Sequence, residues 1–388
     1  MKISVLTPNF SANCFGRAWL LARILQKRFD VEVIGPAFGC GIWGPLKDSC
    51  DFETKVVRGF ADGKFEVKKM LRMIQGDVIY ASKPVMPSFG IGLMKKVRTR
   101  KPLVLDIDDY ELGFGKKFYD SLGILKKIND FRLTALNLNS YYYTVILDKL
   151  VFFANAITVA GKVLHSRYGG TIIYHGRDIN AFNPETIDER KYRREYLPDT
   201  NENTFIMGFV GTPRPHKGVE DIIYALKLSK NADIVLLIIG SNQGEYCNML
   251  RKMVKELGIA GRVIFFPEQP FDKLPSFLSI IDLVAIPQRK MWGSYGQVPA
   301  KIFDAMAMAK PIVSTDTGDI PDIIGGCGWV VESQNPRKLA KAIQHVFDHP
   351  EDAKIIGLKA REKLRNRYSW AVIERQLFSV FENLKQIK

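Results

Sequence analysis

Short apolar strands alternate with helical segments along most of this chain, and this alternation restricts the possible folds more than any other feature. Strands are expected in the first half at residues 2–7, 31–34, 78–81, 103–106, 156–159 and 171–174, with an edge strand at 52–57. Helices are expected between them at about residues 16–28, 65–75 and 89–97. This alternation is typical of a parallel sheet that helices cover on both faces.

The alternation stops at residues 179–204, which are polar, charged and interrupted by Pro184 and Pro198. It then resumes, with strands expected at residues 205–210, 234–239, 263–266, 283–286 and 312–314. Helices are expected at about residues 219–227, 246–257, 300–308, 336–348, 351–367 and 370–384. A chain of 388 residues has room for two domains of ~150 residues. We therefore expect two doubly wound, Rossmann-like α/β domains, at 1–180 and 205–369, with a linker region at 181–204.

The composition excludes several other classes of protein. Hydrophobic residues at 46% and charged residues at 25% are globular values and exclude a largely disordered chain. No apolar run reaches the ~18–20 residues of a membrane span, and the N-terminus lacks the apolar core of a signal peptide. The cysteines are scattered without a CxxC pair, which argues against a disulfide scaffold or zinc site and predicts a cytoplasmic location. These cysteines are Cys14, Cys40, Cys50, Cys247 and Cys327.

The positive charge is concentrated in the first half of the chain. Residues 1–180 hold 27 Lys and Arg against 16 Asp and Glu, a net charge of +11 out of +15. Five cations gather at 95–101, and aromatic residues follow at 114–119 and 141–143, with two lysines at 126–127. Basic and aromatic surfaces together suit an anionic membrane, so we expect peripheral binding to the inner membrane face. Ordinary solvated helices are the alternative, and nucleic acid is not expected because no recognition motif is present.

The first chemical motif follows the strand expected at 205–210. Gly211 would let a ligand approach the backbone closely. Arg214 and Lys217, three residues apart on a loop with two prolines, could converge on one polyanion such as a diphosphate. A solvated turn with two surface cations is the alternative. The spacing fits neither a Walker A loop nor the GxGxxG of a dinucleotide fold.

The second motif is a glycine-rich loop that leads into the helix expected at 300–308. Pro299 near the helix start leaves backbone amides exposed at the positive end of the helix dipole. The amides expected to be free are those of Gly296, Gln297 and Val298. Asp304 would share a helix face with Lys301, either as a simple ion pair or as a carboxylate that accepts hydrogen bonds from sugar hydroxyls. In the second case the arrangement suits a nucleotide sugar, bound in a cleft between the carboxyl ends of the two sheets.

These motifs, in this order and spacing, resemble the family-4 retaining glycosyltransferases of the GT-B fold over about residues 171–370. Residues 174–184 are similar to the family's interdomain segment, and 316–324 to the loop after its donor-binding helix. Residues 368–370 are similar to the start of its last helix. In this fold the last helix crosses back, so the resemblance implies that 370–388 packs on the N-terminal domain.

The resemblance also assigns candidate binding residues. The family places its diphosphate-binding arginine and lysine in the first motif, which here corresponds to Arg214 and Lys217, with Thr212 where many members have the arginine. Of the two glutamates that the family carries eight residues apart, the second corresponds to Asp304 and the first is replaced by Gly296. The N-terminal loop of the family binds the acceptor, which implies such a role for Asn13, Gly16 and Arg17.

The resemblance implies transfer of a sugar from a nucleoside-diphosphate sugar to a glycan or lipid-linked acceptor, with retention at the anomeric carbon. Cations and helix amides would stabilise the departing diphosphate, so neither a metal nor another cofactor is expected. Asp108 or Asp109, after the strand at 103–106, would orient the acceptor, although capping or a local charge cluster is the alternative. The leaving phosphate would take the acceptor's proton, so no dedicated nucleophile is needed.

Three other functions fit the same sequence less well. Another GT-B enzyme, such as a nucleotide-sugar epimerase or a glycan synthase on soluble acceptors, would share the fold. A basic nucleic-acid-binding α/β protein would use the charge of the first domain. A NAD-dependent dehydrogenase would need a glycine fingerprint after the first strand, which is absent.

Overall fold

The computed structural model describes residues 1–61, 63–120, 123, 138, 140–229, 231–241 and 244–385. The lysines expected to contribute charge at 126–127 lie outside these residues. The chain divides into two compact units, which are described separately. Unit 1 comprises Met1–His175, Trp292–Val298 and Ile373–Lys388, and unit 2 comprises Gly176–Met291 and Pro299–Val372.

Unit 1 is built on a seven-stranded sheet in the order β3-β2-β1-β4-β5-β6-β7. Its strands are β1 (Lys2–Leu6), β2 (Asp30–Ala37), β3 (Glu53–Arg58), β4 (Val78–Ser82), β5 (Leu103–Ile107), β6 (Ala156–Val159) and β7 (Thr171–Ile172). All neighbouring strands pair in parallel. The order reverses between β1 and β4, so the loops that follow these two strands diverge at their carboxyl ends, which is where doubly wound sheets bind ligands.

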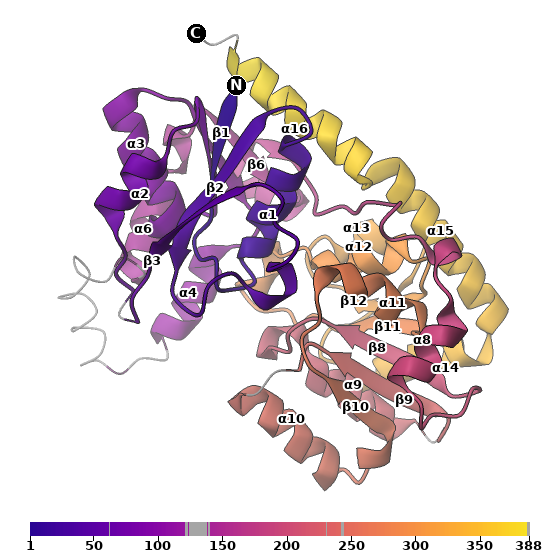
Figure 1. The fold of residues 1–388 in the computed structure, drawn as a ribbon. Coiled ribbons are helices and arrows are strands. Elements are labelled where there is room, and N and C mark those ends of the chain that lie inside the picture. The colour runs from indigo at the N-terminus through magenta and orange to yellow at the C-terminus, as the bar shows by residue number, and fades with distance from the viewer. Residues whose placement is uncertain are drawn as a thin grey trace. The chain divides into compact units, whose positions relative to one another are not determined.

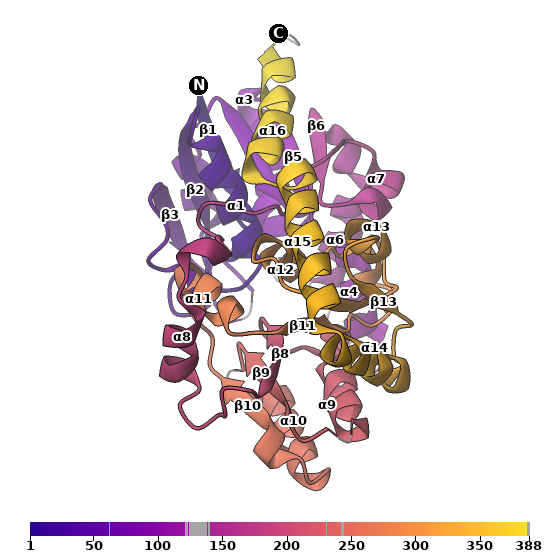
Figure 2. The same ribbon diagram turned by 90° about the vertical axis from the view of Figure 1, so that its right-hand side faces the viewer.

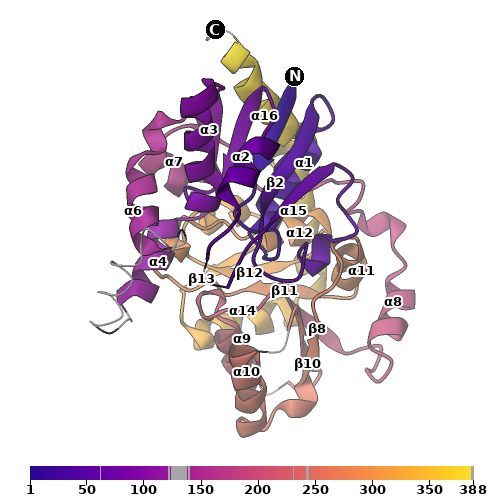
Figure 3. The same cartoon turned by 60° about the vertical axis from the view of Figure 1, so that its left-hand side comes forward.

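Helices cover both faces of this sheet, as Figures 1 and 3 show. They are α1 (Phe15–Leu25), α2 (Val67–Met73), α3 (Ile91–Thr99), α4 (Glu111–Asp120), α6 (Tyr141–Lys149), α7 (Lys162–Tyr168) and most of α16 (Trp370–Lys385). Ile79 and Ala81 of β4 pack with residues of α2, α3 and α6 on one face. Tyr80 points to the other face, where its ring meets Phe381 of α16. The alternation of side chains along β4 therefore supplies both layers of the core.

Unit 2 repeats the plan with a six-stranded parallel sheet in the order β10-β9-β8-β11-β12-β13. Its strands are β8 (Phe205–Val210), β9 (Ile234–Ile239), β10 (Val263–Phe266), β11 (Leu283–Ile286), β12 (Ile312–Thr315) and β13 (Trp329–Val331). Its helices are α8 (Glu189–Tyr196), α9 (Val219–Leu228), α10 (Glu245–Glu256), α11 (Leu274–Ser279), α12 (Ala300–Ala307), α13 (Ile320–Ile324), α14 (Pro336–Asp348) and α15 (Pro350–Arg367). The order of this sheet reverses between β8 and β11.

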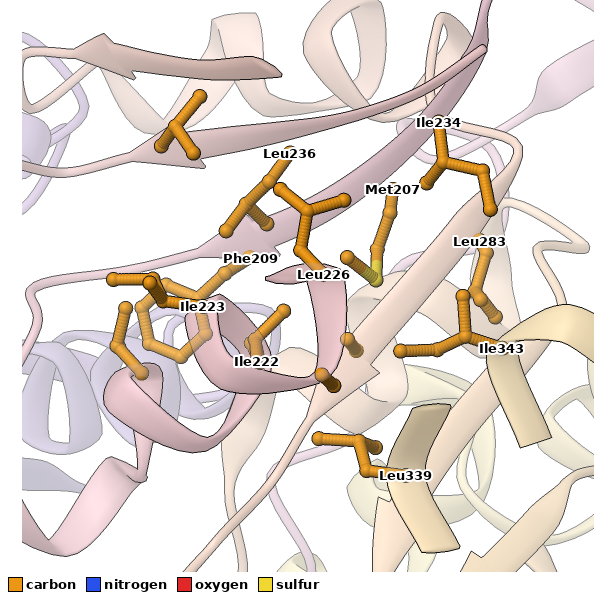
Figure 4. Close-up of a cluster of buried hydrophobic side chains, with 14 of the residues drawn as sticks. Met207, Phe209, Ile222, Ile223, Leu226, Ile234, Leu236, Leu283, Leu339 and Ile343 are labelled. Carbon is orange, nitrogen blue, oxygen red and sulfur yellow. The ribbon is translucent and has the colours of Figure 1, made fainter. Parts of the chain in front are cut away.

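The core of unit 2 lies between the sheet and helices α9 and α14. Met207 and Phe209 of β8 and Leu236 of β9 face Ile222 of α9 and Ile343 of α14, and all are buried (Figure 4). Apolar residues spaced three and four apart along α9 and α14 explain why these helices lie flat on the sheet.

The expected fold class is confirmed, since both units are doubly wound α/β structures with parallel sheets. Several boundaries differ from those expected. The expected linker at 181–204 belongs to unit 2 and contains α8, whose Tyr196 stacks on Phe277 of α11 at 4.1 Å between ring centroids. The segment Trp292–Val298 belongs to unit 1, although the residues on either side of it belong to unit 2.

The last helix, α16, joins unit 1 from Ile373 onward, beside the strands of that unit (Figure 2). Phe378 packs edge-on against Phe29, and the Lys27 ammonium lies 2.6 Å from the Glu374 carboxylate. Among the described helices, none is both long enough and apolar enough to cross a bilayer.

Candidate functional site

The carboxyl end of β8 in unit 2 carries the first candidate site. Gly211 follows this strand with φ of +117°, a conformation that only glycine adopts easily. Its N–H is satisfied within the sheet by the Ile239 carbonyl at 2.8 Å. A Cβ built on Gly211 would lie 3.5 Å from the Nζ atom of Lys301. The missing side chain therefore leaves the Gly211 backbone next to a lysine amine.

Lys301, the second residue of α12, is 9% exposed, and its Nζ atom lies 3.6 Å from the centroid of the Phe209 ring. Among the described residues, this amine has no hydrogen-bond partner, and the ion pair with Asp304 that was one of the two alternatives is not formed. Burial and the charge of Lys217 lower the pKa of Lys301 well below its usual value, while Asp304 acts weakly in the opposite direction. An unpaired buried amine at the end of a strand is typical of a ligand site rather than of a stabilising contact.

The loop between β8 and α9 brings a second lysine to this place. Lys217 ends a short 3₁₀ turn, Pro215–Lys217, and its Nζ atom donates to the Thr212 carbonyl at 2.9 Å. Arg214 is exposed and lies in extended backbone. Gly218 then starts α9 with φ of +65°, and a Cβ there would lie 2.1 Å from the Pro287 carbonyl oxygen. The loop is thus held tightly at its end, and Lys217 lies close enough to Lys301 for their charges to interact.

The carboxylate of Asp304 has a different partner from Lys301, with which it was expected to share a helix face. Its carboxylate is buried and pairs with the Nε atom of Arg177, which is also buried and lies before α8 in the chain. The Nη1 atom of Arg177 donates to the Gly176 carbonyl at 2.6 Å, and its guanidinium lies over the Phe271 ring at 5.5 Å. The sequence reasoning placed Arg177 in a family-like segment but assigned it no role. Asp304 remains a predicted donor-binding residue, and the structure adds a buried cation that orients it.

The other predicted donor residues lie in unit 1. The side chain of Gln297 donates to the Oδ1 atom of Asp109 at 2.7 Å. The backbone N–H of Gln297, expected to be free for a ligand, donates instead to the Ser294 carbonyl at 3.1 Å, because residues 294–296 form a 3₁₀ turn. Val298 is buried, and a Cβ on Gly296 would lie 2.8 Å from Leu164. The segment is therefore packed into unit 1, and the expectation of a free Gln297 amide is wrong.

A second candidate site, at the carboxyl ends of β4 and β5, is a cluster of acids around one buried lysine. Lys83 follows β4 with φ of +72°, unusual for a residue with a side chain. Its Nζ atom pairs with Asp109, with Glu111 at 2.6 Å and with Asp108 at 3.1 Å. The sequence reasoning missed Lys83, although its place directly after an expected strand next to that of the acids was a usable signal.

The two predicted catalytic acids differ in their ionisation. Burial raises the pKa of Asp108 to about 7, against the opposing charge of Lys83. Burial also disfavours the charged form of Asp109, but Lys83 and the Gln297 hydrogen bond outweigh it, so the pKa of Asp109 lies below its usual value. Paired acids whose pKa values are driven apart are a recurring feature of sites that handle protons.

The predicted acceptor residues surround the start of α1. Arg17 is buried and bidentate to Asp106, with Nε to Oδ2 at 2.9 Å and Nη2 to Oδ1 at 2.8 Å. It also donates to the carbonyls of Ile173 and Tyr174. These contacts connect α1 to β5 and to the end of β7. In this structure Arg17 therefore stabilises the positions of the elements around the site.

Asn13 lies in the loop before α1 and Gly16 is the second residue of that helix, and the Gly16 N–H donates to the Asn13 carbonyl at 3.1 Å. Burial raises the pKa of the neighbouring Cys14 to about 12, and the charges of Lys83 and Glu111 also act on this thiol. The structure therefore brings this loop beside the acid cluster within unit 1.

Part of the chain is similar in sequence to known proteins. Residues 188–363 match the family described as glycosyl transferases group 1. The D-inositol 3-phosphate glycosyltransferase of Corynebacterium glutamicum (strain R) is 26% identical over 223 residues, 55% of this chain and 51% of that protein. This chain thus spans about half the length of the D-inositol 3-phosphate glycosyltransferases it matches. CapM of Staphylococcus aureus, a capsular polysaccharide biosynthesis glycosyltransferase, is 24% identical over 81% of this chain and 80% of CapM.

Solved structures agree on the fold along the whole chain. Sucrose-phosphate synthase from Thermosynechococcus elongatus matches with a TM-score of 0.78 and 15% identity, covering 100% of both chains. HepE of Anabaena, solved in complex with UDP-glucose, matches with a TM-score of 0.78 and 21% identity, covering 99% of this chain and 100% of HepE. Residues 188–363 are thus similar in sequence to the glycosyl transferases group 1, and the chain has the fold of the GT-B glycosyltransferases.

Proposed function

We propose that this protein transfers a sugar from a nucleoside-diphosphate sugar to a glycan or lipid-linked acceptor, with retention of configuration at the anomeric carbon. The observation that carries the proposal is the group at the end of β8, where Gly211 exposes backbone beside the amines of Lys301 and Lys217. This group lies within the residues that match the glycosyltransferase family.

The donor side follows from the chemistry of the leaving group. When the glycosidic bond breaks, negative charge builds up on the departing diphosphate, and fixed cations placed there lower the barrier. Lys217 and the exposed Arg214 lie in one loop and can reach the same anion, and Lys301 lies beside Gly211. HepE was solved with UDP-glucose, which supports a nucleotide sugar as the donor.

The acceptor side is assigned to the acid cluster of unit 1. Asp109, held ionised by Lys83, or Asp108 in its ionised form can accept a hydrogen bond from an acceptor hydroxyl and orient it for attack. The names of the relatives, which refer to a capsular polysaccharide and to D-inositol 3-phosphate, support an acceptor that carries hydroxyl groups. Retention is inferred from the family resemblance, in which the leaving phosphate accepts the proton of the attacking hydroxyl.

A membrane-borne acceptor is supported by one surface of unit 1. Phe152 and Phe153 are 68% and 51% exposed, with ring centroids 4.6 Å apart, and the Phe153 carbonyl accepts a hydrogen bond from Lys96 at 2.7 Å. Lys95 and Lys101, expected to face lipid, also donate to backbone carbonyls of unit 1, whereas Arg98 and Arg100 are exposed. An exposed aromatic pair in contact with Lys96 of α3, together with exposed arginines at the end of that helix, suits an anionic leaflet, where each cation adds about 1 kcal/mol.

The donor proposal is tested by nucleotide binding and by one substitution. Thermal shift with nucleoside diphosphates should show stabilisation, since a ligand at 100 times its Kd adds about 2.7 kcal/mol. Lys217→Ala should lower kcat/KM ~10–150-fold, the effect of losing one charge-assisted contact of about 1.5–3 kcal/mol. Lys227→Ala, at an exposed position on α9, is the matched control. Full activity in Lys217→Ala, or the absence of any nucleotide effect on stability, would refute the donor assignment.

The membrane proposal is tested by co-sedimentation with anionic and neutral vesicles. Phe152→Ser combined with Phe153→Ser should release the protein from anionic vesicles, and raised salt should do the same because the attraction is screened. The matched control replaces Ile355 and Leu358, similarly exposed residues on α15 of unit 2. If the double phenylalanine variant binds like the wild type, a soluble acceptor becomes the better proposal.

A further inference from the structure

The amine of Lys301 has no hydrogen-bond partner among the described residues, and its burial requires an explanation. We propose that Lys301 is uncharged in the unliganded protein and takes up one proton when a nucleoside diphosphate binds, so that nucleotide binding is coupled to protonation. The proton comes from the solvent and goes to Nζ, which becomes an ammonium group beside the phosphates. This inference rests on the proposed function, because it concerns the same donor site.

The geometry directs this amine toward the ligand. Lys301 lies in the first turn of α12, and its Nζ atom lies above the Phe209 ring at 3.6 Å. Gly211, which has no side chain, lies on one side of it, and a Cβ there would lie 3.5 Å away. A phosphate that approaches the Gly211 backbone therefore comes within reach of Nζ.

The charges around the amine favour its neutral form in the absence of ligand. Two charged groups act on Lys301, Lys217 from the loop after β8 and Asp304 from its own helix. Asp304 pairs with Arg177, so its charge is already compensated. Burial and Lys217 consequently lower the pKa of Lys301 well below its usual value. A neutral amine avoids the cost of a buried ammonium without hydrogen-bond partners.

A bound diphosphate reverses this balance. Its negative charges, held in a buried site, favour the protonated form of a nearby amine. The preference is strongest once the glycosidic bond has broken, because the diphosphate then carries its largest charge. Lys301 would thus become a cation when and where the leaving group needs one, which stabilises the transition state more than the ground state.

The test is calorimetric titration of the wild-type protein with UDP, GDP and ADP at pH 8, in two buffers of different ionisation enthalpy. At this pH the terminal phosphate, with a second pKa of about 6, is already ionised, so proton uptake reports the protein. We expect uptake of one proton for the wild type and none for Lys301→Met or Lys301→Arg. Lys301→Met should also bind ~10–150-fold more weakly, the effect of one lost charge-assisted contact. Lys227→Met, at an exposed position, should behave like the wild type.

Each outcome separates this inference from the proposed function. Nucleotide binding without proton uptake in the wild type overturns the inference alone, and so does a Lys301→Met variant with wild-type affinity. If no nucleoside diphosphate binds at all, the donor site itself is wrong and both proposals fail. The two-buffer measurement on the wild type needs no variant, so a Lys301→Met protein that fails to fold does not remove the test.

Discussion

Replacing Lys83 by methionine removes the buried cation with which the acids of this cluster in unit 1 pair. Its Nζ atom pairs with Asp108, Asp109 and Glu111, and the lysine itself is buried. Although burial opposes its charge, these carboxylates raise the pKa of Lys83 well above its usual value. Methionine keeps most of the side-chain volume, so the change isolates the charge.

The expected loss of stability follows from the buried setting. Removing one partner of a buried ion pair costs about 3–5 kcal/mol, because the remaining charge is left uncompensated. For a structural unit of ~200 residues, each kcal/mol lowers Tm by about 2–4 °C, so the variant should melt ~6–20 °C below the wild type. The acids remaining in the variant can reduce the loss only by taking up protons.

This proton uptake determines how the loss of stability in the variant should depend on pH. Without Lys83, burial raises the pKa of the acids in the folded state above the value of ~4 that they have when unfolded. The folded variant then binds more protons than the unfolded chain, so its stability falls as pH rises from about 4. The deficit relative to the wild type should therefore be large at pH 8 and smaller at pH 5.

Differential scanning calorimetry at pH 5 and pH 8 measures this deficit. Lys47→Met, which replaces an exposed lysine of the same unit, is the matched control and should change Tm little at either pH. An equal deficit at both pH values would mean that Lys83 acts through packing, and a deficit as small as that of Lys47→Met would refute the buried ion cluster.

Three further predictions concern the two sites. Activity should persist in excess EDTA, because Asp106 and Asp108, two residues apart as in a metal-binding DxD pair, are each engaged by a cation of the protein; loss in EDTA that magnesium restores would contradict this. Asp304→Asn should destabilise the protein by about 3–5 kcal/mol in thermal melts, since it leaves Arg177 buried without its partner; an unchanged melting temperature would show that the pair contributes nothing. If ionised Asp108 orients the acceptor, kcat/KM should rise with pH through about 7, the pKa to which burial raises this acid, and a rise that persists in Asp108→Asn would assign it to another group.

The strands were predictable because their signal is local. The ranges expected for β8, β9, β10 and β11 coincide with the observed ones, since buried parallel strands are short runs of apolar residues between turn-forming residues. Helix α8 was not expected because its sequence is almost entirely polar and charged. It is held by the stacking of Tyr196 on Phe277, a contact between residues far apart in the chain.

In the candidate sites too, some residues could be recognised from the local sequence and others only from the tertiary structure. Gly211, Lys217 and Lys301 could be selected from the sequence. A glycine directly after a strand and cations near the start of a helix indicate an anion-binding loop, and both features can be recognised from neighbouring residues alone. The partners of the buried charges could not be selected. Lys83 meets Asp109 because β4 and β5 are neighbours in the sheet, and Asp304 meets Arg177 across 127 positions of sequence.

By itself, therefore, the sequence determined two parallel α/β sheets and the loops at which an anion could bind, because these depend on hydrophobic periodicity and on the conformational freedom of glycine. Only the tertiary structure decided the ionisation of the site. Lys301 differs from other lysines of the chain because burial removes water from its amine without supplying a hydrogen-bond partner among the described residues, while Lys217 repels its charge. Burial and neighbouring charge are set by which elements pack together, and no local pattern in the sequence records them.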